Sequence, residues 1–380
     1  IASFLFYLVM ERVRKVVNHL EPKLLLSLVA GSEEEIVVTE STNGMKVLLN
    51  KPKALNAVNL NMIEKIQVAL DHAKLVNKKL FLVRGEGERA FCAGGDIRAL
   101  ATAAKSGDYD YCSEFFSKEF NLDREIAELK DSGDLTYISL LNGITMGGGV
   151  GLSVHSKFVI ATESIKFAMP ETGIGFFCDV GGSYFLPRLP GKIGTYIALT
   201  GYRLNLADVL YCGIASHFCP SSHLDELEKK LMGSDGSVSS IERILSELQS
   251  SHSVPEMKSS LRENREMIDD CFSGITMEQI ISRLEAQNQN SWAQKTLKTL
   301  ATKCPTSLKL ELECIRRGNN MDIREVAAME FNVAMHCMRH PDFYEGVRAL
   351  IIEKDNKPAW NPSNLEQTTM FNIFSFFKSN

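Results

Sequence analysis

The chain has 380 residues, of which 44% are hydrophobic, so it is long and apolar enough for one large domain or for two or three smaller ones. Its formal net charge of -5 at pH 7 argues against a general nucleic-acid-binding surface, which needs a basic stripe to displace counterions. The cysteines are odd in number and include no C-x-x-C spacing, which indicates reduced thiols of an intracellular protein rather than a disulfide framework.

The first 32 residues form a predicted N-terminal extension. Their longest apolar candidate, Ala2 to Met10, is far shorter than the roughly 20 residues of a membrane-spanning helix. Basic residues, including Arg12, Arg14 and Lys15, then alternate with apolar ones. Two interpretations stay open: a trimmed organelle presequence, or a surface helix or added segment at the edge of the domain.

A strand, a turn, a helix and a second strand are predicted next. Met45 to Leu49 is apolar, Lys51 to Asn56 is a polar turn, and Asn59 can cap a helix. Phe81 to Val83 is typical of a buried strand. One face of the predicted helix carries Met62, Ile63, Ile66 and Leu70.

Two glycine turns stand between a strand and a helix. Gly94 and Gly95 precede a predicted helix that begins at Ile97, and the triple glycine 147–149 follows the strand Tyr137 to Leu141. This repetition indicates a largely parallel sheet, in which ligands lie beyond the carboxyl ends of the strands. Both turns should therefore face one cleft. Each is also compatible with a purely structural tight turn.

Two carboxylates follow the next predicted strand, Phe158 to Ala161. Glu171 stands after an apolar approach and a proline, and Asp179 has apolar neighbours on both sides. Burial would raise their pKa values toward the range useful in acid–base catalysis, although such a carboxylate can also be a helix cap or an ion-pair partner. Backbone donors together with carboxylates suggest acyl chemistry.

Beyond about residue 230 the pattern becomes helical, with apolar residues on one face of segments 241–248 and 277–284. Asp322 and Glu325 resemble a capping box. The Ser- and Gly-rich stretch Gly233 to Ser240 is predicted to be a linker. We expect one composite domain, with a core over residues 33–232 and a mainly helical part over residues 233–380.

Two other candidate sites are rejected at this stage. His336, Cys337 and His340 share a helical segment, but no fourth ligand has matching spacing, so no metal site is predicted. Cys92 lies in a glycine turn without a neighbouring histidine, and we interpret it as a buried packing residue.

From Met45 to Pro362 the chain resembles the crotonase (enoyl-CoA hydratase/isomerase) superfamily, and within it the branch of thioester hydrolases. The motifs that carry the resemblance are AFCAGGD at 90–96, GITMGGGVGLSVH at 143–155, FAMPETGIG at 167–175 and DVGGSYFLPRLPG at 179–191. The resemblance implies an α/β fold, a spiral of ββα units with a helical C-terminal region that completes an acyl-CoA pocket.

The resemblance also implies roles for individual residues. Gly95 and Gly148 would be the oxyanion-hole donors, Glu171 the catalytic carboxylate and Asp179 its partner, and Glu119 would contact the substrate. The implied activity is the release of CoA from 3-hydroxyisobutyryl-CoA, or equally 3-hydroxypropionyl-CoA, in valine catabolism. Glu171 either attacks the thioester carbonyl or activates a water, and the sequence leaves both routes open.

Two positions distinguish this chain from relatives. Hydratases of the superfamily carry a glutamate where this chain has Gly151, so hydration with two glutamates is not expected. Cys178 stands where the hydrolases usually have proline, which removes a φ restraint beside Asp179.

The alternatives to hydrolysis are a hydratase or isomerase of the same superfamily, and a non-catalytic RNA-binding or assembly protein on the same fold. For the hydrolase we expect no cofactor, since coenzyme A is part of the substrate, and no metal, nucleic-acid or membrane partner. A homo-oligomer is compatible with the sequence. The basic N-terminal stretch and the absence of a peroxisomal tripeptide at residues 377–380 favour the mitochondrial matrix.

Overall fold

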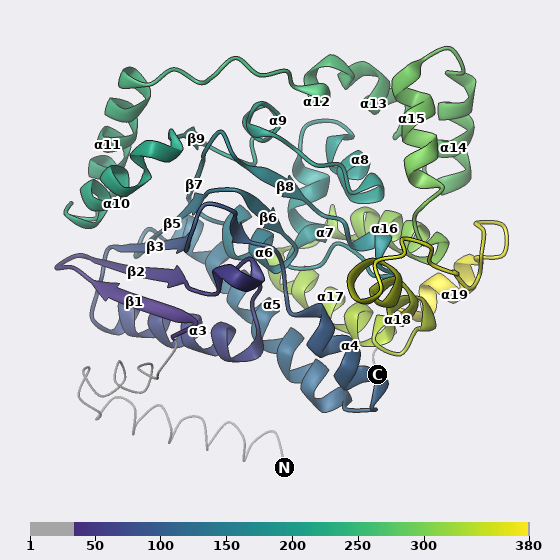
Figure 1. The fold of residues 1–380 in the computed structure, drawn as a ribbon, viewed down its shortest axis with the longest axis horizontal. Helices are drawn as coiled ribbons and strands as arrows, with labels where there is room; N and C mark the ends of the chain where they lie inside the picture. Colours follow the sequence, from purple (N-terminus) through teal and green to yellow (C-terminus); the bar gives the residue numbers. More distant parts are fainter. Residues whose placement is uncertain (1–33, 379–380) are drawn as a thin grey trace.

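The computed structural model describes residues 34–378, and the predicted N-terminal extension, residues 1–32, lies outside this range. The described residues form a six-stranded sheet in the order β1-β2-β3-β5-β7-β9 and a three-stranded sheet in the order β4-β6-β8 (Figure 1). The larger sheet consists of β1 (Ile36–Glu40), β2 (Gly44–Leu49), β3 (Leu80–Gly85), β5 (Thr136–Leu141), β7 (Phe158–Ala161) and β9 (His217–Phe218). The smaller sheet consists of β4 (Ala90–Cys92), β6 (Ile144–Met146) and β8 (Lys166–Ala168).

From β3 onward, successive strands belong alternately to the two sheets, because β3, β5 and β7 are each followed by a strand of the smaller sheet. Helices α4 (Ile97–Lys105) and α5 (Tyr109–Ser132) come after β4, and α6 (Gly148–Val154) comes after β6. All neighbours in both sheets are parallel except β1 and β2. The predicted spiral of ββα units and the four predicted strands are therefore confirmed.

Both faces of the larger sheet are covered, which explains the continuous apolar runs of its central strands. On one face Leu82 and Ile138 pack in a cluster with Leu227 of α10 (Leu224–Met232) and Leu245 of α11 (Val238–Ser251). On the other face, Phe81 and its neighbours join a core that includes α3 (Leu60–Leu75) and α5. The position of the functional turns is thus fixed by a sheet buried on both sides.

Side-chain caps begin several helices where the sequence predicts them. Asn59 Oδ1 accepts the Met62 N–H at 2.9 Å at the start of α3, and Asp322 forms the capping box with Glu325. The predicted linker 233–240 is too long, however. Its Ser237 accepts the N–H of Ser240 and caps α11, so the last three residues of the stretch are helical.

The remaining described chain is mainly helical, as predicted, and none of the described helices is long and apolar enough to cross a membrane. In Figure 1 the C-terminal helices lie beside the core, where α17 packs against α5, α16 against α7 and α18 against α4. These later helices are α7 (Gly182–Phe185), α8 (Ile193–Thr200), α9 (Leu206–Tyr211), α12 (Ser260–Glu263), α13 (Arg265–Cys271), α14 (Met277–Ala286), α15 (Ser291–Leu300), α16 (Pro305–Gly318), α17 (Ile323–Cys337), α18 (Pro341–Val347) and α19 (Met370–Ser375). Short helical turns are η1 (Pro52–Ala54), η2 (Glu171–Gly173), η3 (Leu186–Arg188), η4 (Ser221–His223) and η5 (Arg348–Ile352).

Candidate active site

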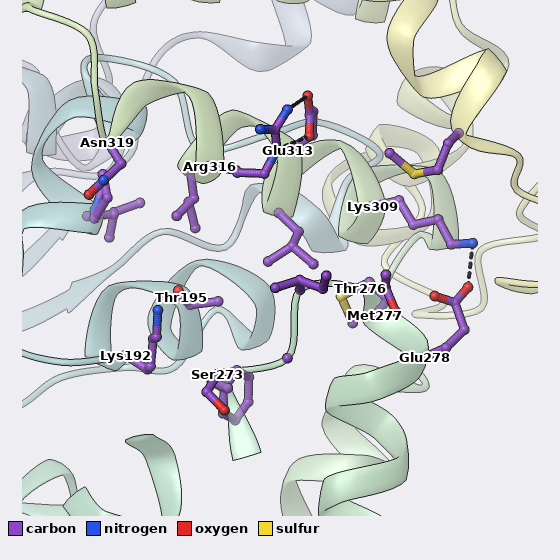
Figure 2. Close-up of a pocket in the computed structure, with 18 of the residues that line it drawn as sticks. Lys192, Thr195, Ser273, Thr276, Met277, Glu278, Lys309, Glu313, Arg316 and Asn319 are labelled. Carbon is purple, nitrogen blue, oxygen red and sulfur yellow. Dashed lines mark hydrogen bonds and ion pairs between the residues drawn. The ribbon is translucent and has the colours of Figure 1, made fainter. Parts of the chain in front are cut away.

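Two cavities differ in the chemistry they can support. The first, of about 800 Å³, lies between α8, α16, α19 and the segment 272–278 (Figure 2). Four of its charged side chains form ion pairs: Lys309 Nζ lies 2.5 Å from Glu278 Oε1, and Arg316 lies 2.7 Å from Glu313. None of the residues that the sequence singles out for catalysis lines it. The predicted acyl chemistry therefore belongs elsewhere.

The second cavity, of about 240 Å³, collects every predicted site residue. We call it the cleft. Its polar lining includes Gly95, Gly148, Glu119, Glu171 and Asp179, which come from five separate parts of the chain. Its apolar lining includes Phe115, Phe116, Phe176, Leu350 and Ile351. Leu350 and Ile351 belong to η5, so the C-terminal part of the chain contributes to the cleft, as predicted.

The two glycine turns meet at the cleft. A Cβ atom added to Gly148 would lie 3.3 Å from the backbone nitrogen of Gly95 and 2.6 Å from Glu119 Oε1. Gly147, which precedes α6, has φ +47°, a conformation that glycine adopts without strain. Within residues 34–378, the N–H groups of Gly95 and Gly148 donate no hydrogen bond. Two free backbone donors thus face one space, as an oxyanion site requires.

Glu171 is the first residue of η2, and its carboxylate is buried beside the second glycine turn. A Cβ atom on Gly147 would lie 3.4 Å from Glu171 Oε1, while Oε2 has no hydrogen-bond partner among the described residues. Burial raises the pKa of Glu171 to about 8, and the charge of Lys303 opposes this rise. The burial predicted for Glu171 is confirmed, and it places the pKa in the range of a general base.

Asp179 lies in the loop after η2 and is also buried. Burial and the nearby carboxylates of Glu119, Glu171 and Glu330 raise the pKa of Asp179 well above its ordinary value. Its carboxylate makes no hydrogen bond within the described part of the chain and lines the cleft. The position of Asp179 is therefore set by the backbone that carries it.

A further carboxylate, Asp123, was not predicted. It lies one helical turn after Glu119 on α5 and is buried, and neither of its oxygens has a hydrogen-bond partner among residues 34–378. Burial raises the pKa of Asp123 well above its usual value and that of Glu119 to about 8. The spacing of four residues on one helix face was the available signal, since it places both side chains on one side of α5.

Asp123 also explains why position 151 carries a glycine. A Cβ atom on Gly151 would lie 2.7 Å from both Asp123 oxygens and 2.7 Å from Val180 Cβ. No real Cβ contact is this short, so a side chain at position 151 has no room. Glu119, Glu171 and Asp179 line the cleft, and Asp123 occupies the space beside Gly151.

Hydrogen bonds restrain the loop beside Asp179, although Cys178 lacks the φ restraint that a proline would give. The Cys178 N–H donates to Glu311 Oε2 at 2.7 Å, a bond that a proline could not make. On the other side of Asp179, the ring Nε2 of His155 lies 3.0 Å from the carbonyl oxygen of Val180. The restraint lost with the proline ring is thus replaced by a hydrogen bond.

Cys92, His336 and His340, for which the sequence predicts no catalytic or metal-binding role, are buried or hydrogen-bonded to neighbouring backbone. Cys92 is fully buried, and burial raises its thiol pKa to about 12, so it carries no thiolate near neutral pH. His336 Nδ1 lies 2.9 Å from the Asn332 carbonyl oxygen, and His340 Nδ1 accepts the N–H of Asp342. No group of three or more potential metal ligands occurs within residues 34–378.

Comparison with known proteins gives consistent matches. Residues 45–377 match the family model described as enoyl-CoA hydratase/isomerase. The chain is 45% identical over 358 residues to a 3-hydroxyisobutyryl-CoA hydrolase, mitochondrial, of Danio rerio, which covers 93% of this chain and 90% of the relative. It is 40% identical over 372 residues to the Homo sapiens protein of the same name, covering 97% and 94% of the two chains.

Solved structures match the fold over a similar length. A carnitinyl-CoA dehydratase from Mycobacterium thermoresistibile is 31% identical with a TM-score of 0.82, covering 91% of this chain and 97% of that one. An enoyl-CoA hydratase from Rhodobacter sphaeroides is 32% identical with a TM-score of 0.81, covering 90% and 97%.

Proposed function

The chain belongs to the enoyl-CoA hydratase/isomerase family, and we propose that it is a thioester hydrolase that releases CoA from 3-hydroxyisobutyryl-CoA, a step of valine catabolism. One observation carries the proposal. The free N–H groups of Gly95 and Gly148 and the buried carboxylates of Glu171 and Asp179 line the same small cleft. Donors for a developing oxyanion and a base with a raised pKa are what hydrolysis of a thioester needs.

The reaction begins when the thioester carbonyl oxygen takes hydrogen bonds from the Gly95 and Gly148 amides. In one route the Glu171 carboxylate adds to the carbonyl carbon, the C–S bond breaks to release CoA thiolate, and water hydrolyses the resulting mixed anhydride. In the other route Glu171 takes a proton from a water that adds to the same carbon, and the C–S bond then breaks as CoA leaves and takes up that proton from Glu171. Asp179 positions the substrate hydroxyl or the water in both routes.

Hydrolysis is favoured over hydration by the surroundings of Gly151. Hydration in this family relies on a second glutamate at that position, and here the space is filled by Asp123 and Val180. The size of the cleft, about 240 Å³, supports a short acyl group with the CoA portion outside. A 3-hydroxypropionyl group is equally compatible with that volume.

Cofactor requirement, location and oligomeric state are proposed as well. Carboxylates and backbone amides can supply the base and the oxyanion donors, so we propose that the reaction needs no metal or cofactor, and that activity survives complete chelation. We propose a mitochondrial location, because the named relatives are mitochondrial, and we further propose the matrix as the compartment. We also propose that the enzyme is a homo-oligomer and that it binds neither nucleic acid nor a membrane.

The test is CoA release from 3-hydroxyisobutyryl-CoA, followed with a chromogenic thiol reagent, with crotonyl-CoA hydration measured in parallel. Wild type should release thiol. The rate of CoA release should fall at least about a hundredfold in Glu171→Gln and in Asp179→Asn, which corresponds to roughly 2.7 kcal/mol of transition-state stabilisation. Hydration of crotonyl-CoA without thiol release would favour a hydratase. Inactivity in both assays would favour the non-catalytic alternative.

A further inference from the structure

Two buried glutamates from the C-terminal helices hold the backbone on both sides of Asp179. Glu311 of α16 accepts the Cys178 N–H through Oε2 at 2.7 Å. Glu330 of α17 accepts the Gly181 N–H through Oε2 and the Ser183 N–H through Oε1, both at 2.8 Å. Each glutamate has an exposed fraction of 0%. Both lie more than 130 residues after the loop in sequence.

These carboxylates are not used in ion pairs. Glu313, also on α16, is paired with Arg316 and Arg317. Glu311 and Glu330, in contrast, pair with no Lys, Arg or His within residues 34–378, and their main stabilising contacts are the loop N–H groups. Burying a carboxylate without a cation is costly, and charge-assisted bonds from backbone amides offset part of that cost. A packing role alone would be served better by an apolar side chain.

The loop needs outside support. Val180 has φ +53° and Gly181 has φ +77°, and a β-branched residue at positive φ is strained. The Asp179 side chain makes no hydrogen bond within the described residues, so its direction depends on this strained backbone. Glu330 holds Gly181, the residue immediately after strained Val180, and Glu311 holds the residue before Asp179. The contacts therefore restrain the loop on both sides of the catalytic carboxylate.

We propose that Glu330 and Glu311 are positioning residues for the reaction, which hold the 178–183 loop so that the Asp179 carboxylate faces the cleft. This inference rests on the proposed function, because it assigns Asp179 a catalytic role. It makes the helical C-terminal part of the chain responsible for the geometry of a residue in the spiral core. A displacement of about 1 Å at a reacting group can lower the rate a hundredfold.

Glu330 also acts on Asp179 through its charge. The carboxylates that face Asp179 are Glu119 and Asp123 from α5, Glu171 from η2 and Glu330 from α17. Each of them favours the protonated form of Asp179, so removing the Glu330 charge should lower the pKa of Asp179.

The decisive variant is Glu330→Gln, because a glutamine amide can accept only one of the two N–H bonds and turns its NH₂ group toward the other donor. We expect kcat to fall at least about thirtyfold, equivalent to about 2 kcal/mol, with KM within about threefold of wild type. Glu311→Gln can keep its single bond through the amide oxygen, so its loss should be smaller, about threefold to tenfold. The matched control, Glu313→Gln, should keep kcat within about twofold.

Charge and geometry are separated by two further measurements. In the plot of kcat/KM against pH, the part that follows the titration of Asp179 should move to lower pH in Glu330→Gln. Glu330→Asp keeps the charge but not the reach, so kcat should fall while this part of the plot stays in place. If folded Glu330→Gln keeps kcat within about threefold of wild type, the proposal is overturned.

A fold-independent measurement covers the case in which Glu330→Gln does not fold. Hydrogen exchange of the wild-type amides of Gly181 and Ser183 should be slow, because each N–H is bonded to a buried carboxylate. Exchange as fast as at exposed Gly107 would overturn the proposal. A wild-type protein that releases no CoA would instead refute the proposed function, whereas an active wild type with an equally active Glu330→Gln refutes the positioning role alone.

Discussion

Replacing Gly148 by alanine should separate activity from stability at the oxyanion site. The added Cβ would lie 2.6 Å from Glu119 Oε1, 3.1 Å from Val58 Cγ2 and 3.3 Å from the Gly95 nitrogen. The nearest atom is the end of a flexible side chain, and the backbone of Gly148 does not have a positive φ. The stability cost should therefore be modest, about 1–2 kcal/mol, the lower part of the range for overpacked sites.

The loss of activity should be much larger. A thioester oxygen has to lie about 2.7–3.1 Å from both donor nitrogens, and the new methyl group occupies the space between them. Excluding the oxygen from one donor costs about a hundredfold to a thousandfold in kcat, or roughly 2.7–4 kcal/mol. Binding of the CoA portion outside the cleft should change much less.

The assay is the rate of CoA release at saturating substrate, beside urea unfolding of the same preparation. Gly233→Ala is the matched control, since Gly233 ends α10 away from the cleft and its backbone φ is −87°. The control should retain full activity. A folded Gly148→Ala that keeps more than about a tenth of wild-type kcat would refute the oxyanion assignment of Gly148.

Three further predictions follow from the buried charges around the cleft. The ionised form of Glu171 is the reactive one and burial raises its pKa to about 8, so kcat/KM should increase with pH up to about 8; a flat profile between pH 6 and 8 would contradict this role. Lys303 lowers the pKa of Glu171, so Lys303→Met should move that limb to higher pH, and an unmoved limb would show that the two charges are not coupled. Gly151→Ala should lower the free energy of unfolding by about 1–3 kcal/mol, because its Cβ would overlap Asp123 and Val180, and unchanged urea unfolding would show that the contact relaxes at no cost.

Much of the fold could be predicted because its signals are local. The strands over residues 45–49 and 137–141 are apolar runs, and Asn59 and Asp322 are caps whose partners lie two or three residues away. The predicted linker failed at residues 238–240 for an equally local reason. Serine is common both in loops and at helix starts, and Ser237 here is an N-cap.

The candidate site was predicted only in part. Motifs close in sequence identify the glycine turns, Glu171 and Asp179, and the structure brings them together with Glu119 in one cleft. Asp123, Glu311 and Glu330 were missed, because their importance depends on contacts between distant parts of the chain. Glu311 is a buried glutamate among buried apolar residues of α16 such as Leu310 and Cys314, which is an unusual place for a carboxylate without a cation.

The most direct test of the central claim is product analysis after incubation of the wild-type protein with 3-hydroxyisobutyryl-CoA in H₂¹⁸O. The hydrolase account predicts free CoA and an equal amount of 3-hydroxyisobutyrate with ¹⁸O in its carboxylate, by either route through Glu171. An intact thioester that gains ¹⁸O only at its 3-hydroxyl, through dehydration and rehydration, would contradict the account and identify a hydratase.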